Sequence, residues 1–150
     1  MGFPLPQEHT SPSGVLRLRH SPAAVSSARR QVGADLSALG IPEAVRDDIE
    51  VVVSELLGNS VRHARPIAGG VVLLHWQAGP DEITVRVTDG GGGRRVEPRQ
   101  PGPLAVSGRG LQIVERLARV WGVSEHVGGL RSVWATVPLT GSPRALRLVT

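Results

Sequence analysis

The sequence predicts an α+β fold of two layers, in which three helices cover one face of a mixed, largely antiparallel sheet. The strand-like segments come in pairs separated by short turns that contain glycine, which favours β-hairpins. Three further segments place apolar residues at helical spacing, and such helices bury one side against a sheet. The length of 150 residues suits one domain with its own core.

The first predicted elements are a strand and a helix that follow a flexible leader. Residues 1–13 are rich in Pro and Ser and lack an apolar pattern, so we expect them to be flexible. Residues 14–19 alternate apolar and basic side chains, which indicates a half-buried strand. Ser21-Pro22 suits a helix start as N-cap and first-turn residue, and Gly40 suits its end after Leu39.

The second predicted helix starts at Ile41-Pro42-Glu43 and continues to His63 or Ala64. Proline in the first turn and an acidic residue behind it are typical of a helix start. Apolar residues then recur at helical spacing and form a wide stripe: Val45, Ile49, Val52, Val53, Leu56, Leu57 and Val61.

Two hairpins and a third helix complete the predicted domain, which spans residues 14–137. Residues 71–76 and 82–88 form the first hairpin, and a glycine run and a loop over 94–107 follow it. The third helix starts at Gly108-Arg109-Gly110 and ends at Gly122. Residues 123–127 and 132–137 form the last hairpin around Gly128-Gly129, and residues 138–150 are a tail.

The composition excludes several kinds of chemistry. All 17 basic residues are Arg, so a Walker A loop and Schiff-base catalysis, which both need Lys, are excluded. The absence of Cys excludes disulfides, zinc–thiolate sites and thiol nucleophiles. The net charge of +4 admits a DNA-binding interpretation. Because the arginines are scattered among acidic residues, we expect no direct contact with nucleic acid.

The distribution of apolar residues predicts a cytoplasmic protein. No apolar run approaches the roughly 20 residues that span a bilayer. The N-terminal residues do not follow the pattern of a signal peptide, in which a basic region precedes an apolar one. We therefore expect no membrane contact.

Three short features carry possible chemistry, although each alone also has a simple structural explanation. Glu55, Asn59 and His63 lie four residues apart on the second helix, as a ligand-binding stripe or a solvated face. Residues 89–93, Asp-Gly-Gly-Gly-Gly, allow close backbone approach to a ligand, or form a flexible loop. Residues 107–111, Ser-Gly-Arg-Gly-Leu, begin a helix whose N–H groups would favour an anion.

Together and in this order, the three features resemble the GHKL-type ATP-binding domain shared by the Hsp90 chaperones, type II topoisomerases and sensor histidine kinases. The chain is most similar to the stand-alone branch of anti-sigma-factor serine/threonine-protein kinases and their actinobacterial relatives. Residues 54–64, Ser-Glu-Leu-Leu-Gly-Asn-Ser-Val-Arg-His-Ala, and the hairpin from Gly128 to Trp134 are typical of that branch. The chain departs from it at Arg131-Ser132, where many members have Lys-Thr or Thr-Thr.

The resemblance implies a role for each matching residue. Asn59 would bind Mg²⁺, Asp89 would accept a hydrogen bond from the adenine amino group, and Glu55 would be the general base. Gly91 and Gly93 would lie beside the base, and Gly108, Gly110 and Leu111 would form the helix start that holds the phosphates. His63 would touch phosphate or serve as a surface or capping residue. Arg109 would add positive charge near the phosphates or remain solvated.

Two functions follow from the resemblance. In the first, the chain is a protein-serine kinase that transfers the γ-phosphate of ATP to an anti-anti-sigma, STAS-like partner, and also holds a sigma factor. In the second, it is a non-catalytic nucleotide-binding module that sequesters a partner protein such as a sigma factor. Both imply ATP or ADP as ligand with Mg²⁺, and both allow a homodimer. The Glu55 carboxylate separates them, because only the kinase needs it.

Overall fold

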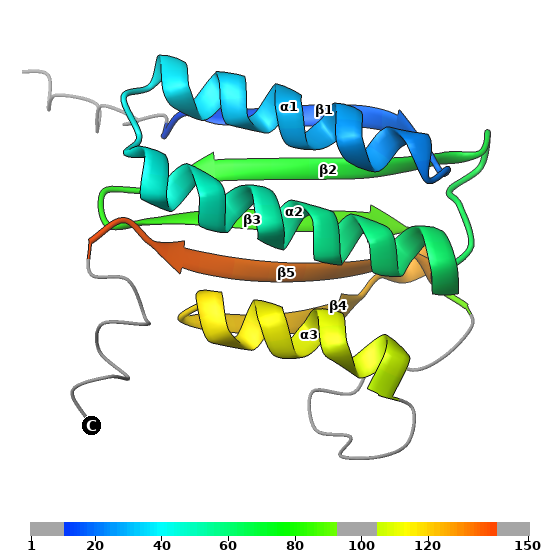
Figure 1. The fold of residues 1–150 in the computed structure, drawn as a ribbon. Coiled ribbons are helices and arrows are strands. Elements are labelled where there is room, and N and C mark those ends of the chain that lie inside the picture. The colour runs from blue at the N-terminus through cyan, green and yellow to red at the C-terminus, as the bar shows by residue number, and fades with distance from the viewer. Residues whose placement is uncertain (1–10, 93–104, 141–150) are drawn as a thin grey trace, which may run out of the picture.

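The two-layer α+β fold predicted from the sequence is confirmed by the computed structural model (Figure 1), which describes residues 11–92 and 105–140, with residues 105–110 as backbone only. The described strands are β1 (Ser13–Arg19), β2 (Val71–Ala78), β3 (Glu82–Asp89), β4 (Val120–Glu125) and β5 (Arg131–Pro138). They form one sheet in the order β1-β2-β3-β5-β4. Every neighbouring pair in this sheet is antiparallel.

Three helices form the second layer: α1 (Ala23–Ala38), α2 (Glu43–His63) and α3 (Ala105–Leu117). Figure 1 shows all three on the same face of the sheet, with α2 between α1 and α3. The central strands bury every second residue beneath these helices, as strand geometry requires. Fully buried side chains of α2 and of the strands share one core, which includes Ile49, Val53, Leu57, Leu74, Ile83 and Val85.

The predicted end of α1 is confirmed in detail. Gly40 has a φ of +78°, the left-handed conformation that glycine adopts without strain. The amide of Ile41 donates to the Leu36 carbonyl at 3.1 Å, and the amide of Gly40 donates to Ser37 at 3.0 Å. This pair of bonds is a Schellman motif, which satisfies carbonyls that the helix leaves without partners. The predicted N-cap role of Ser21 is wrong, because Pro22 occupies the cap and no side chain caps α1.

The second half of the chain corrects three expected boundaries. Helix α3 begins at Ala105, three residues before Gly108, and ends at Leu117. Gly122 lies inside β4 and does not end α3 as predicted. The Trp134 ring covers this position and leaves no room for a side chain: a Cβ on Gly122 would approach Cζ2 of Trp134 to 2.7 Å. A strand glycine that admits a neighbouring ring cannot be told from a helix stop by sequence alone.

The ends of the domain also extend slightly beyond their predicted limits. Ser13, expected in the leader, is the first residue of β1, and the Pro12 carbonyl accepts the Ala78 amide at 2.8 Å. Pro138 is the last residue of β5, and the Leu139 amide donates to Asp81 at 2.9 Å. The predicted flexibility of the leader, most of the predicted loop and the final part of the tail lie outside the described residues.

Candidate nucleotide site

The three sequence features meet at one end of the molecule. Figure 1 shows the C-terminal end of α2, the C-terminal end of β3 and the N-terminal end of α3 at the same edge of the helix–sheet unit. Asn59 and His63 lie in the last turns of α2, and Asp89 is the last residue of β3. The antiparallel sheet and the direction of α2 thus bring together residues that lie far apart in the sequence, such as Asn59 and Asp89.

Two backbone hydrogen bonds join the end of α2 to the glycine run. The Arg65 amide donates to the Gly91 carbonyl at 2.9 Å, and the Gly90 amide donates to the Arg65 carbonyl at 2.7 Å. Gly90 lies so close to the Pro66 carbonyl that a Cβ there would overlap it. This reciprocal contact holds the segment after β3 against the segment after α2, and it explains why a side chain is excluded at position 90.

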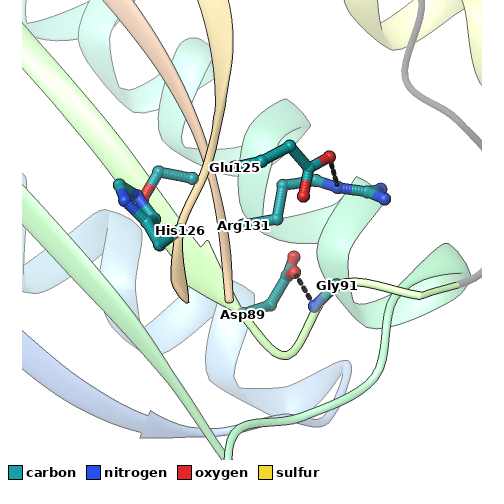
Figure 2. Close-up of polar contacts among 6 residues, drawn as sticks. Asp89, Gly91, Glu125, His126 and Arg131 are labelled. Carbon is teal, nitrogen blue, oxygen red and sulfur yellow. Dashed lines mark hydrogen bonds and ion pairs between the residues drawn. The ribbon is translucent and has the colours of Figure 1, made fainter. Parts of the chain in front are cut away.

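Asp89 is the buried acidic group of the site, with 3% of its surface exposed. Its Oδ1 accepts a hydrogen bond from the Gly91 amide at 2.8 Å (Figure 2), which fixes the orientation of the carboxylate. Gly91 has a φ of +63°, and a Cβ there would lie 2.5 Å from the Gly129 carbonyl. The second oxygen, Oδ2, accepts no hydrogen bond from the described residues and remains available to a donor on a ligand.

The α2 residues of the predicted site flank the buried stripe of that helix. Glu55, Asn59 and His63 follow one another at four-residue intervals, and each is partly exposed. The Asn59 Oδ1 lies 3.5 Å from an Arg62 nitrogen, a contact too long to engage the oxygen strongly. The adjacent Ser60 carbonyl bonds His20 Nε2 at 2.8 Å, which ties this turn of α2 to the segment before α1.

The structure also identifies a residue that the sequence analysis did not include in the site. Arg131 opens β5 directly opposite Asp89 on one side and Glu125 on the other. Its side chain is 10% exposed, and its Nε donates to Glu125 Oε1 at 3.0 Å (Figure 2). The departure at Arg131 was visible in the sequence. Its position beside Asp89 depends on the strand order β3-β5-β4, which the sequence does not reveal.

The glycines of the third feature are placed differently from the prediction. Because α3 begins at Ala105, the helix N–H groups without intrahelical partners are those of residues 105–108. Gly108 falls among them, whereas Arg109, Gly110 and Leu111 lie in the next turn. The nucleotide contacts assigned to these residues stay predictions, and Gly93 lies outside the described residues.

The described residues at this end offer few protein ligands to a metal ion. Within residues 11–92 and 105–140 no cluster of three or more His, Asp or Glu side chains suits a metal ion. The uncharged Asn59 oxygen alone would hold a cation weakly, but Mg²⁺ keeps water and phosphate oxygens as most of its ligands.

Among the helices that the structure describes, none is long and apolar enough to cross a membrane.

Comparison with known proteins identifies a protein family and a similar fold. Residues 18–136 match the model of the histidine kinase-like ATPase domain. The fold is similar to the crystal structure of the RsbU and RsbW domains of Rv1364c from Mycobacterium tuberculosis, with a TM-score of 0.60 and 21% identity. That match covers 85% of this chain but only 32% of the other, so this chain spans about a third of that protein. A search of curated proteins gave no match.

Proposed function

Because this chain belongs to the family of histidine kinase-like ATPase domains, we propose that it is an ATP-binding regulatory protein with protein-serine/threonine kinase activity. Its substrate would be a Ser or Thr of an anti-anti-sigma partner. The observation that carries the proposal is the buried Asp89 carboxylate, which the Gly91 amide orients. Two backbone hydrogen bonds between Arg65 and the glycine run hold this segment beside the end of the helix that bears Asn59. We further propose a cytoplasmic location, a sigma factor as second partner, and a homodimer.

The Asp89 carboxylate suits an adenine amino group. A buried carboxylate with one oxygen already bonded to the Gly91 amide offers the other to a single N–H donor. A base that carries a carbonyl oxygen in place of the amino group would bring this acceptor against the Asp89 carboxylate, which is also an acceptor, and no hydrogen bond could form. Discrimination of this kind is strong, because binding of the wrong base leaves a buried polar group without a hydrogen-bond partner.

Asn59 and Glu55 have separate roles at the phosphate end of the proposed site, one in metal binding and one in proton transfer. In the proposed reaction, Asn59 Oδ1 would help to hold Mg²⁺ together with phosphate oxygens, and the bound ion would neutralise charge on the transferred group. Glu55 lies one helical turn before Asn59 and would accept the proton of the substrate hydroxyl as that oxygen attacks the γ-phosphorus. The bond between the γ-phosphorus and the oxygen bridging to the β-phosphate breaks, and ADP leaves. Phosphoryl transfer depends mainly on positioning and electrostatics, so a rigid helix such as α2 is a suitable support.

Replacing Glu55 by Gln tests the kinase activity. We expect transfer from radiolabelled ATP to purified anti-anti-sigma proteins to fall by about 10²- to 10⁴-fold, the usual contribution of a general base. Nucleotide binding should be retained. Asp47→Asn is the matched control, because it removes an exposed carboxylate from the same helix. If the wild type binds Mg-ATP but transfers no phosphate to any of these proteins, the non-catalytic function replaces the kinase.

A further inference from the structure

The face of the sheet opposite the helices is a second surface with its own chemistry. Figure 1 shows that α1, α2 and α3 all lie on the other side. Strand register places the residues of this surface in rows across the sheet. One row, for example, runs Val15, His75, Arg86, Trp134 and Gly122. We call this surface the outer face, and its described members are Ser13, Val15, Arg17, Arg19, Val71, Leu73, His75, Gln77, Glu82, Thr84, Arg86, Thr88, Val120, Gly122, Ser124, Ser132, Trp134 and Thr136.

The charge of the outer face is almost entirely positive. Arg17 and Arg19 are exposed on β1, and Arg86 lies at the centre of the sheet beside His75. Among the described members, the one carboxylate is that of Glu82, at the far end of β3. It is already paired with Arg119 at 3.2 Å. Three arginines therefore face outward without a carboxylate of the same face to neutralise them.

The outer face is also partly apolar and structurally fixed. Val15 is 63% exposed and Val120 is 49% exposed, at opposite edges of the sheet. The Trp134 ring lies over Gly122 between them. Hydroxyl pairs Thr84–Thr136 at 3.1 Å and Thr88–Ser132 at 2.7 Å satisfy each other, so these polar groups need no water. Arginine and tryptophan beside exposed aliphatic groups are the composition of protein-binding surfaces.

Neither a second copy nor the rest of the chain supplies the missing negative charge. A second copy would bring the same arginines to the contact. Residues 1–10, 93–104 and 141–150 together contain five Arg but only two acidic residues, Glu8 and Glu97. The opposite charge must therefore come from another molecule.

We propose that the outer face binds an acidic, partly apolar segment of a partner protein. Five strands spaced about 4.8 Å apart give a platform roughly 20 Å wide, which suits a helix or strand pair more than a whole domain. A nucleic acid would require more phosphate contacts and more stacking rings than three arginines and one tryptophan supply. Because Asp89 faces the helices, this contact does not depend on the proposed nucleotide function.

Titration with a synthetic amphipathic peptide of Glu, Leu and Ala tests this proposal. The NMR signals of the indole N–H groups report the site, because Trp134 lies on the outer face whereas Trp76 is buried beneath the helices. We expect the peptide to shift the Trp134 signal and to bind on the order of tenfold more weakly to Arg17→Glu/Arg86→Glu. The same peptide with Gln for Glu should bind as weakly.

The controls separate this surface from others. Arg29→Glu/Arg30→Glu makes the same charge change on exposed positions of α1 and should leave binding unchanged. Arg17→Gln/Arg86→Gln serves if the reversed pair does not fold. Mg-ATP should stabilise all folded variants equally, which would show that a loss of peptide binding does not arise from damage to the nucleotide site. Undiminished peptide binding by the face variants, tighter binding of a single-stranded oligonucleotide, or dimerisation lost with these arginines would each overturn the proposal.

Discussion

At the scale of single residues, the candidate site depends on close contacts that specific glycines permit. Gly90 and Gly91 approach carbonyl oxygens of Pro66 and Gly129, and Gly91 also donates to Asp89. From the sequence, such glycines were expected to allow close approach of a ligand. In the structure, Gly90 and Gly91 instead allow neighbouring backbone segments to approach, and the Gly91 amide orients the Asp89 side chain. The glycine run is therefore part of the support for Asp89.

Substitution at Gly91 tests this role. Gly91→Ala should destabilise the fold by about 2–4 kcal/mol, because it combines a left-handed φ with a contact of 2.5 Å to Gly129. Gly128→Ala is the control, since Gly128 also has a positive φ of 84° but has nothing within 4 Å. It should cost only about 1–2 kcal/mol. Urea unfolding measures both, and equal losses would argue against the packing role of Gly91.

The Arg131–Glu125 pair predicts unequal effects of its two members. Glu125 is 66% exposed, so Glu125→Gln should change the free energy of unfolding by less than about 1 kcal/mol. Arg131→Ala should cost more, about 2–3 kcal/mol, because it removes a long side chain that is only 10% exposed. Denaturant unfolding of the two variants decides the matter. A greater loss from Glu125→Gln would show that the ion pair, and not the packing, is the stabilising part.

At the scale of helices and strands, the sequence was most informative where its pattern was long. The apolar stripe of α2 and the alternation in β3 gave the right element and nearly the right bounds. Helix α3 was less well predicted, because Gly108 and Gly110 lie inside it and Gly122 lies inside β4. A glycine has no side chain to show whether it ends a helix, bends a strand or makes room for a ring. Its role is settled by tertiary neighbours such as Trp134.

The Schellman motif that ends α1 gives a prediction at this scale. Gly40→Val should destabilise by more than about 1 kcal/mol, because a β-branched residue resists the φ of 78° at this position. Gly40→Asn should cost less, since Asn enters that conformation more readily. Beyond the neighbouring residues, no atom lies within 4 Å of a Cβ at this position, so steric overlap does not contribute to the difference between the two variants. Equal melting temperatures for the two variants would contradict the conformational explanation.

At the scale of the whole molecule, the order of the strands in the sheet is the feature that could not be predicted from the sequence. The hairpins β2–β3 and β4–β5 follow from adjacent segments, but the pairing of β3 with β5 joins Asp89 to Arg131 across 42 positions. No local pattern contains that information. Side chains along β3 and β5 alternate between the two faces of the sheet. Asp89 lies on the helix side, and Arg86 and Trp134 lie on the outer face. Nucleotide chemistry and partner binding can therefore be tested independently.

The measurement that tests the central claim most directly is thermal unfolding with and without Mg-ATP. It compares the wild type with Asn59→Ala and Asp89→Asn, with Gln31→Ala, which removes an exposed amide from α1, as control. At a hundredfold excess over its dissociation constant, Mg-ATP should stabilise the wild type and the control by about 2.7 kcal/mol. The midpoint would then rise by about 5–10 °C. The shift should be largely lost in both site variants. An unchanged midpoint in the wild type, or an equal rise in all four proteins, would contradict a nucleotide site built on Asn59 and Asp89.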